Sequence, residues 1–285
     1  MHPVRQKIRL LLRALVIFYL LVRTALVYVV GWTLMRLGGR SLAARQAFFG
    51  ECVLNLFRRL GATFIKVGQI MSTRPDLLPP HIIQALAKLQ DDVGPFPFAQ
   101  VRTTIEEDFG RELSSLFTEF SPLPIASASV AQVHKARLPS GELVAVKVRR
   151  PDIEELCTFD LGVMRLYARV LELIPSLRLL APLDSVEQFG RAIRMQLDFT
   201  VEAQNNRRFT RNFATLPEVC LPRLYDDLCS RRVLVMEFID GVKILDFKRS
   251  GVEPRRLGLL GFRVMLKMIF ADGFVHADLH PGNIL

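Results

Sequence analysis

The longest apolar stretch of the sequence lies near its N-terminus. Residues Ala14–Met35 are 22 consecutive positions with one charge, Arg23. A helix of this length can cross a bilayer. A central arginine costs about 2.5–3.5 kcal/mol on insertion scales, which about a dozen large apolar residues at roughly 0.3–0.6 kcal/mol each offset. A spanning helix and an in-plane helix both stay open, with a buried core helix as the alternative outside a membrane.

Basic residues surround this stretch, and no acid precedes Glu51. The net charge of the chain is +10, and eight of the basic residues lie within residues 1–50. Arg5, Arg9 and Arg13 recur every four residues, which predicts one basic stripe along a helix. Nucleic acid could match such charge, but the apolar stretch favours membrane lipid instead. A cleaved signal peptide fits poorly, because no small-x-small site follows at a suitable distance.

Strict alternation marks a strand at residues 142–148, Glu-Leu-Val-Ala-Val-Lys-Val. A period of two puts Val144, Val146 and Val148 on one face and Lys147 on the other. The valines can therefore enter a core while Lys147 faces a cleft beside the small Ala145. The segment also matches the V-A-I-K pattern of kinase nucleotide-binding lobes. A lysine on a strand more often lies on a solvated edge. A functional role for Lys147 is therefore supported only by the other kinase-like segments of the sequence.

A loop rich in small residues precedes this strand. Residues 126–133, Ala-Ser-Ala-Ser-Val-Ala-Gln-Val, follow the G-x-G-x-x-G-x-V pattern with alanine at each glycine position. Each added Cβ disfavours φ > 0 and keeps the backbone away from phosphates. We therefore expect a stiffer loop that holds phosphates differently from an ordinary kinase loop. Pro139-Ser140-Gly141 predicts a hairpin turn into the Lys147 strand.

The last ten residues read His276-Ala-Asp-Leu-His-Pro-Gly-Asn-Ile-Leu285. They fit the H-x-D-L-x-x-x-N catalytic loop, in which the aspartate accepts the proton of the attacking hydroxyl and the asparagine binds a metal ion on the phosphates. Asp278 and Asn283 have that spacing. The alternative is a surface turn that contains a chance histidine and aspartate.

Together these segments resemble the UbiB/AarF family of atypical kinase-like proteins, from about residue 45 to the C-terminus. Lys66-Val67-Gly68-Gln69 adds the K-x-G-Q signature of that family, and helical spacing places Lys66 and Gln69 on one face. The resemblance implies that this helix packs over the nucleotide cleft and restricts protein substrates. It also implies nucleotide contacts from the loop and its flanks, namely Ile125, Ala126, Ser127, Ala128, Ser129, Val130, Ala131, Gln132 and Val133.

The resemblance also suggests an ion-pair partner for Lys147. On a helix predicted over residues 188–213, it points to Glu202 as the partner and to Asp198 as a polar contact of the Lys66 helix. The first acid of the E-x-D segment of the family is Gln196 here, which removes a charge and puts metal coordination at that point in doubt. Glu154 and Glu155 are rival partners by spacing.

Two further elements complete the order of segments. Residues 233–241 predict an apolar strand that ends in a turn, and the strand resembles the connector whose backbone amides bind adenine. Residues 257–270 have helical periodicity and lead to the Asp278 loop. The cysteines, Cys52, Cys157, Cys220 and Cys229, show no metal-type spacing and are expected to be free thiols.

We therefore expect an α+β protein with a kinase-like fold: a membrane-associated segment (1–45), a helical K-x-G-Q extension (46–120), an antiparallel-sheet nucleotide-binding lobe (121–240) and the start of a helical lobe (241–285). The resemblance implies an ATPase or kinase that uses ATP and Mg²⁺ and supports ubiquinone biosynthesis at the cytoplasmic side of a membrane. Its partners would be nucleotide, membrane lipid and quinone-pathway proteins or lipids, without nucleic acid.

Two other functions stay open. A small-molecule phosphotransferase would share the Asp278 loop, and a non-catalytic membrane adaptor would explain Gln196. The D-F-G aspartate, the main metal ligand of such sites, would lie beyond Leu285. The sequence is therefore expected to be a fragment or an inactive remnant with little ATP turnover of its own.

Overall fold

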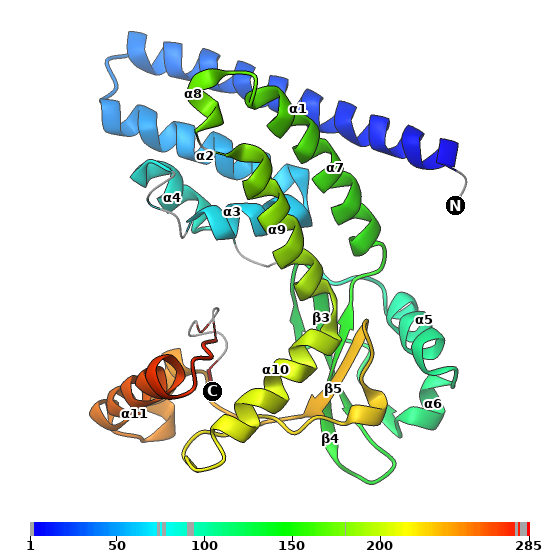
Figure 1. Cartoon of the computed structure of the whole chain (residues 1–285). Coiled ribbons are helices and arrows are strands. Elements are labelled where there is room, and N and C mark those ends of the chain that lie inside the picture. The colour runs from blue at the N-terminus through cyan, green and yellow to red at the C-terminus, as the bar shows by residue number, and fades with distance from the viewer. Residues whose placement is uncertain are drawn as a thin grey trace.

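The computed structural model describes residues 3–72, 75, 78–89, 94–179, 181–276, 279 and 284–285. Its centre is a small antiparallel sheet in the order β1-β3-β4-β5, with β2 also paired to β3 (Figure 1). The strands are β1 (Glu119–Phe120), β2 (Ala126–Ser127), β3 (Ala131–Arg137), β4 (Leu143–Arg149) and β5 (Val233–Glu237). Sheet and helices together confirm the α+β class.

The hairpin between β3 and β4 forms where the sequence predicts it. Gly141 has φ +92°, a conformation that favours glycine, and the Leu138 amide donates to the Glu142 carbonyl at 3.0 Å. The register pairs Val133 with Lys147. Val144, Val146 and Val148 are fully buried, so the alternation predicted for this strand is confirmed.

The valine face of the sheet is covered by α5 (Phe98–Phe109) and the short α6 (Leu113–Leu116). Val101 and Ile105 of α5 are fully buried in the same core as the β4 valines. Apolar burial of this kind stabilises by roughly 25 cal/mol per Å². These two helices therefore fix the sheet from one side and leave the face of Lys147 to other elements.

A layer of helices lies at one end of the sheet (Figure 1). It contains α1 (Pro3–Leu37), α2 (Leu42–Leu60), α3 (Ala62–Ser72), α4 (Pro80–Leu86), α7 (Ile153–Leu171) and α9 (Pro182–Leu197), with the short α8 (Pro175–Arg178) between the last two. Ile17, Leu56, Leu60 and Val163 form a cluster that joins α1, α2 and α7. The layer is thus built from segments far apart in the sequence.

The helix predicted over residues 188–213 is wrong in one respect, because it is two helices. It breaks at Asp198, where α9 ends and α10 (Phe199–Asn212) begins. Asp198 is extended (φ −106°, ψ 99°), and its side chain accepts a hydrogen bond from the Thr200 amide at 3.0 Å. This is an N-cap, and it lets α10 turn across the Lys147 face of the sheet.

The C-terminal part begins with two short 3₁₀ segments, Asp226–Leu228 before β5 and Ile244–Ser250 after it. Helix α11 (Pro254–Leu266) continues into a π-helical turn, Lys267–Ala271, which confirms the helix predicted over 257–270. Met268 packs with Phe209 and Phe213 at the end of α10.

All four cysteines are free, as predicted. Burial raises the pKa of the Cys157 thiol to about 11, a shift that a hydrogen bond with Thr63 partly opposes. That thiol is therefore protonated and unreactive at neutral pH.

Candidate functional site

Lys147 of β4 and Glu202 of α10 form an ion pair on the open face of the sheet. The Lys147 Nζ lies 2.8 Å from Glu202 Oε1 and 2.7 Å from Oε2. The side chains are 24% and 44% exposed, so the pair is reachable from solvent. The ammonium also lies 4.9 Å from the ring centroid of the fully buried Phe199.

The ion pair predicted between Lys147 and Glu202 is thus confirmed. The rival acids have other partners: Glu154 binds Arg149 at 2.9 Å, and Glu155 binds Arg9 at 2.5 Å. A bidentate carboxylate on a helix fixes the ammonium at one point above the strand. Its remaining donor capacity can meet an anionic ligand there.

The alanine-rich loop is a closed turn. The Ala128 amide donates to the Ala131 carbonyl at 2.7 Å, and none of the loop alanines has a positive φ. Ala131 is buried with Phe199, which ties the loop to α10. Conformations with φ > 0 are costly for alanine, and the loop avoids them; a stiffer loop that holds phosphates differently stays a prediction.

Arg150 holds this loop from behind, a contact that the sequence did not reveal. Its Nη2 donates to the Ala128 carbonyl at 3.3 Å and to the Gly94 carbonyl at 2.9 Å, and its guanidinium lies 5.1 Å from the Phe96 ring centroid. Only the position of Arg150, just after β4, could have suggested it. The loop is therefore braced by the strand that carries Lys147.

Gln132, predicted among the nucleotide contacts, turns its side chain to the opposite face of β3. It is 1% exposed, accepts from the Phe96 amide at 3.0 Å and lies 2.9 Å from His134 Nε2. The alternation of β3 explains this, because Gln132 and His134 share the core face while Val133 faces the cleft. A nucleotide contact by Gln132 would have to use its backbone.

We expect the fold to lose stability in mild acid through His134. Burial lowers the pKa of its imidazole, and the hydrogen bond to the Ser121 carbonyl only partly opposes this shift. The unfolded chain takes up the proton near pH 6.5 while the folded chain resists it. The stabilisation is therefore fully present above the pKa of the unfolded chain and is lost as the pH falls through the lower pKa of the folded chain.

Urea denaturation at pH 7.5, 6.5 and 5.5 measures this dependence. His134→Gln, which can still donate to the Ser121 carbonyl, should flatten the profile between pH 7.5 and 5.5. An unchanged slope in that variant would contradict the assignment to His134.

Helix α3 carries the K-x-G-Q residues and begins beside the loop. Ala62, its first residue, shares a buried cluster with Val130 of the loop. The Gln69 Nε2 donates to the Leu89 carbonyl at 3.0 Å, which joins α3 to the end of α4. The helix thus lies next to the loop, as the gating hypothesis requires, and the direction of Lys66 into the cleft stays a prediction.

We expect Gly68→Ala to destabilise the protein by about 1–3 kcal/mol through overpacking. A Cβ at Gly68 would lie 2.3 Å from Leu89 Cδ1 and 2.8 Å from Phe57 Cδ1. This exceeds the gain of about 1 kcal/mol in helix propensity. Gly258→Ala in α11, where nothing lies within 4 Å, is the matched control and should stabilise. Urea midpoints compare the two; stabilisation by both would show that α3 can move aside.

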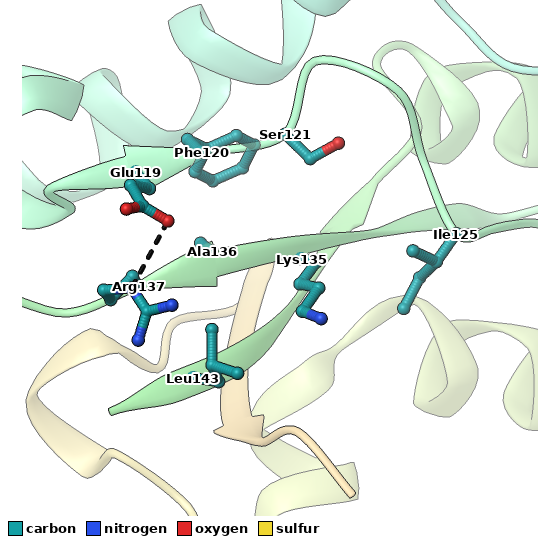
Figure 2. A pocket seen from close by; sticks show the side chains of 8 residues that line it. All are labelled: Glu119, Phe120, Ser121, Ile125, Lys135, Ala136, Arg137 and Leu143. Carbon is teal, nitrogen blue, oxygen red and sulfur yellow. Dashed lines mark hydrogen bonds and ion pairs between the residues drawn. The ribbon is translucent and has the colours of Figure 1, made fainter. Parts of the chain in front are cut away.

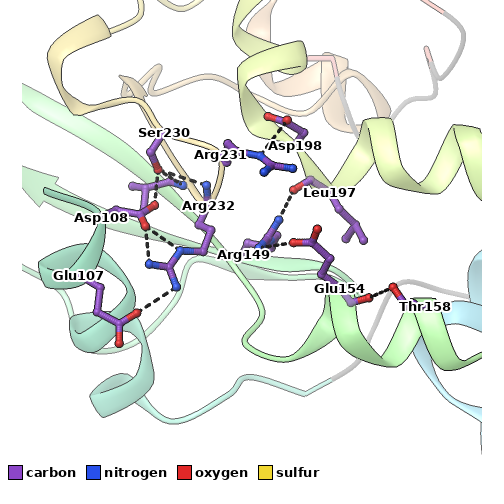
Figure 3. Close-up of polar contacts among 11 residues, drawn as sticks. Glu107, Asp108, Arg149, Glu154, Thr158, Leu197, Asp198, Ser230, Arg231 and Arg232 are labelled. Carbon is purple, nitrogen blue, oxygen red and sulfur yellow. Dashed lines mark hydrogen bonds and ion pairs between the residues drawn. The ribbon is translucent and has the colours of Figure 1, made fainter. Parts of the chain in front are cut away.

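Asp198 does not make the predicted contact with the Lys66 helix. It caps α10 and binds the Arg231 Nε at 3.1 Å (Figure 3). Next to it, the Arg149 Nη1 donates to the Leu197 carbonyl at 2.7 Å. Both arginines therefore hold the junction of α9 and α10 to the sheet, and with it the start of the helix that carries Glu202.

A cavity of about 450 Å³ opens at the hairpin end of the sheet (Figure 2). It is lined by Ile125, Lys135 and Leu143 among others. Lys135 pairs in register with Ala145, so it shares the face of Lys147, and its ammonium lies 4.5 Å from the Phe238 ring centroid. Alternation in β3 could have singled out Lys135, which the sequence reasoning missed.

Asp278 and Asn283, the predicted base and metal ligand, lie outside the described residues. Close to them in sequence, the Ile284 carbonyl accepts from the Ile244 amide at 3.0 Å, and His276 lies 5.9 Å from the Phe209 ring centroid. The described part of the chain contains no cluster of three or more His, Cys, Asp or Glu that could hold a metal ion.

Comparison with known proteins also indicates a kinase-like protein. The ABC1 atypical kinase-like domain matches residues 88–285. A probable protein kinase UbiB of Marinobacter nauticus is 46% identical over 82% of this chain and 44% of its own length. Activity of BC1 complex kinase 3, chloroplastic, of Arabidopsis thaliana is 39% identical over 81% of this chain and 33% of its own length.

A solved structure is also similar. It is the complex of Rv3197 with erythromycin from Mycobacterium tuberculosis, with a TM-score of 0.56 and 29% identity. The match covers 79% of this chain and 57% of that chain.

An antiparallel sheet whose strand lysine pairs with a glutamate of the facing helix defines a protein with a kinase-like fold. The chain belongs to the ABC1 atypical kinase-like family, and the resemblance to UbiB proteins is confirmed. It spans less than half the length of the UbiB relatives it matches.

Proposed function

We propose that this chain forms the nucleotide-binding part of a kinase-like phosphotransferase or ATPase that uses ATP and Mg²⁺. The observation that carries the proposal is the pair of Lys147 with Glu202, half-exposed on the face of the sheet away from the core. In kinase-like proteins this pair positions the nucleotide phosphates.

Three features of the described residues support a nucleoside triphosphate as the ligand. Lys147 offers an oriented positive charge, and the closed turn of residues 128–131 lies two residues before Val133, the register partner of Lys147. Val133 and the small Ala145 provide an apolar surface on the same sheet face, of the kind that a base ring needs. In this proposal Asp278 acts as base or orients water, and Asn283 binds Mg²⁺, which supplies charge neutralisation at the phosphates when bound.

We further propose that the protein supports ubiquinone biosynthesis at a membrane, with the kinase-like domain facing the cytoplasm. The names of the UbiB relatives support the pathway. Helix α1 supports the membrane, because the stretch Leu11–Leu37 is long and apolar enough to cross one and little of it is buried against the rest of the structure. This low burial favours a membrane-associated helix over a core helix.

Calorimetric titration of the folded chain with ATP, in the presence and absence of Mg²⁺, tests the proposal. We expect saturable binding that strengthens with Mg²⁺, accompanied by a rise in Tm that follows the ligand concentration. Neither heat nor a change in Tm at millimolar Mg·ATP would overturn nucleotide binding and favour a non-catalytic adaptor.

A further inference from the structure

One face of α1 is apolar and exposed along the whole helix. Leu15, Tyr19, Leu26, Val30 and Leu37 are each more than half exposed. At 1.5 Å per residue this face is over 30 Å long. Arg23, one turn after Tyr19 and partly buried, is a charged residue beside it. So large an apolar surface marks an interaction site.

The opposite face of α1 is fastened to the rest of the helical layer (Figure 1). The Arg13 guanidinium binds the fully buried Asp160 of α7 at 2.5 and 3.1 Å and the Leu60 carbonyl of α2 at 2.6 Å. Further along, the rings of Tyr28 and Phe49 lie 4.7 Å apart. Helices α2 and α7 therefore accompany α1 over most of its length.

This attachment limits the ways in which α1 can associate with a bilayer. If α1 crossed the membrane as it stands, α2 and α7 would have to enter with it. Helix α2 exposes Arg58 and Arg59, and α7 carries Arg165 in a half-exposed pair with Glu187. Each arginine at the centre of a bilayer costs about 2.5–3.5 kcal/mol on insertion scales. Separating α1 from its partners would instead leave the buried Asp160 charge without Arg13.

An in-plane position avoids both costs. The exposed face would enter the lipid while α2, α7 and their charges stay in water. The charge pattern identifies the occupant as anionic lipid, because residues 1–50 contain eight basic and no acidic residues. Near the end of α1, Arg36 and Arg45 lie 5.6 and 5.1 Å from the Trp32 ring centroid, a group suited to the interface.

We propose that α1 lies flat in the membrane interface with its Leu15–Leu26–Leu37 face in the lipid, and does not cross the bilayer. This inference rests on the proposed membrane association and decides between the two orientations that the sequence leaves open. Helix α7 follows β4 in the chain. Its contact with α1 then holds the sheet face that carries Lys147 at a fixed distance from the lipid surface.

Depth measurements on vesicles of phosphatidylcholine with 30 mol% phosphatidylglycerol test this orientation. Single cysteines at Leu15, Leu26 and Leu37, in a Cys220→Ser background, carry a fluorophore quenched by lipids brominated at known depths. We expect equal depths at all three sites, about 5–10 Å into the headgroup boundary. In a spanning helix Leu26 would lie about 16 Å deeper than the other two, which would overturn the proposal. A cysteine at Leu123, exposed on a distant loop, should show no quenching.

Binding itself is measured by flotation of the same vesicles. Leu26→Glu should weaken binding at least tenfold, whereas the matched Leu123→Glu should leave it unchanged. Failure of the intact chain to float would overturn membrane association as a whole. Self-association that buries the α1 face without vesicle binding would assign the face to a second copy and overturn the lipid proposal.

Discussion

Replacing Arg13 with alanine is expected to lower the free energy of unfolding by about 3–5 kcal/mol, because it leaves a buried carboxylate without its partner. Asp160 is fully buried, and both of its carboxylate oxygens accept hydrogen bonds from the Arg13 guanidinium. Urea denaturation followed by circular dichroism, in one fixed detergent, gives the change in stability.

Arg9→Ala is the matched control, since Arg9 also binds an acid of α7 but at an exposed site. It should cost less than about 1 kcal/mol. The double variant Arg13→Met/Asp160→Leu should recover most of the loss, because removal of both charges leaves no buried ion. Equal, small effects of Arg13→Ala and Arg9→Ala would mean that water reaches Asp160.

Replacing Lys147 with methionine is expected to weaken Mg·ATP binding by about tenfold to a hundredfold. The substitution keeps the length of the side chain and removes a charged donor, which contributes about 1.5–3 kcal/mol when it meets an anion. Glu202→Gln should have a smaller effect in the same direction, because the ammonium remains but is held less firmly. Calorimetric titration measures both.

Lys88→Met is the control for loss of a lysine from an ion pair, because Lys88 binds Glu51 at an exposed site in the helical layer. It should bind nucleotide as the unaltered chain does. All three variants should unfold within about 1 kcal/mol of the parent, since none of the side chains is fully buried. Unchanged affinity of Lys147→Met would place the phosphates elsewhere.

The sequence contained the local part of the site. The alternation around Lys147 predicted the strand and the face on which Lys147 lies, because a period of two depends only on neighbouring residues. The turn residues before it predicted the hairpin. The facing helix was found through the resemblance, which supplied Glu202. Its break at Asp198 was missed because the extended residue depends on Arg231, a partner 33 residues away.

The partners of the basic stripe of α1 were missed for a similar reason. Spacing alone gave Arg9 and Arg13 a common helical face, but their acids lie 146 and 147 residues further along the chain. Both arginines are therefore paired within the protein, Arg13 at a partly buried site and Arg9 at an exposed one. Gln132 likewise had the right position in its motif but the wrong face, because its bonds to Phe96 come from a segment outside the motif.

The long separation between Arg13 and Asp160 also orders events during protein synthesis. The two residues are 147 positions apart, and ribosomes add about 5–20 residues per second. Helix α1 is therefore made roughly 7–30 seconds before the helix that fastens it exists. During that interval Arg9 and Arg13 lack the acids of α7 that they bind in the folded protein. The attachment of α1 to the helical layer through Arg13 therefore forms late in synthesis, only after α7 has been made.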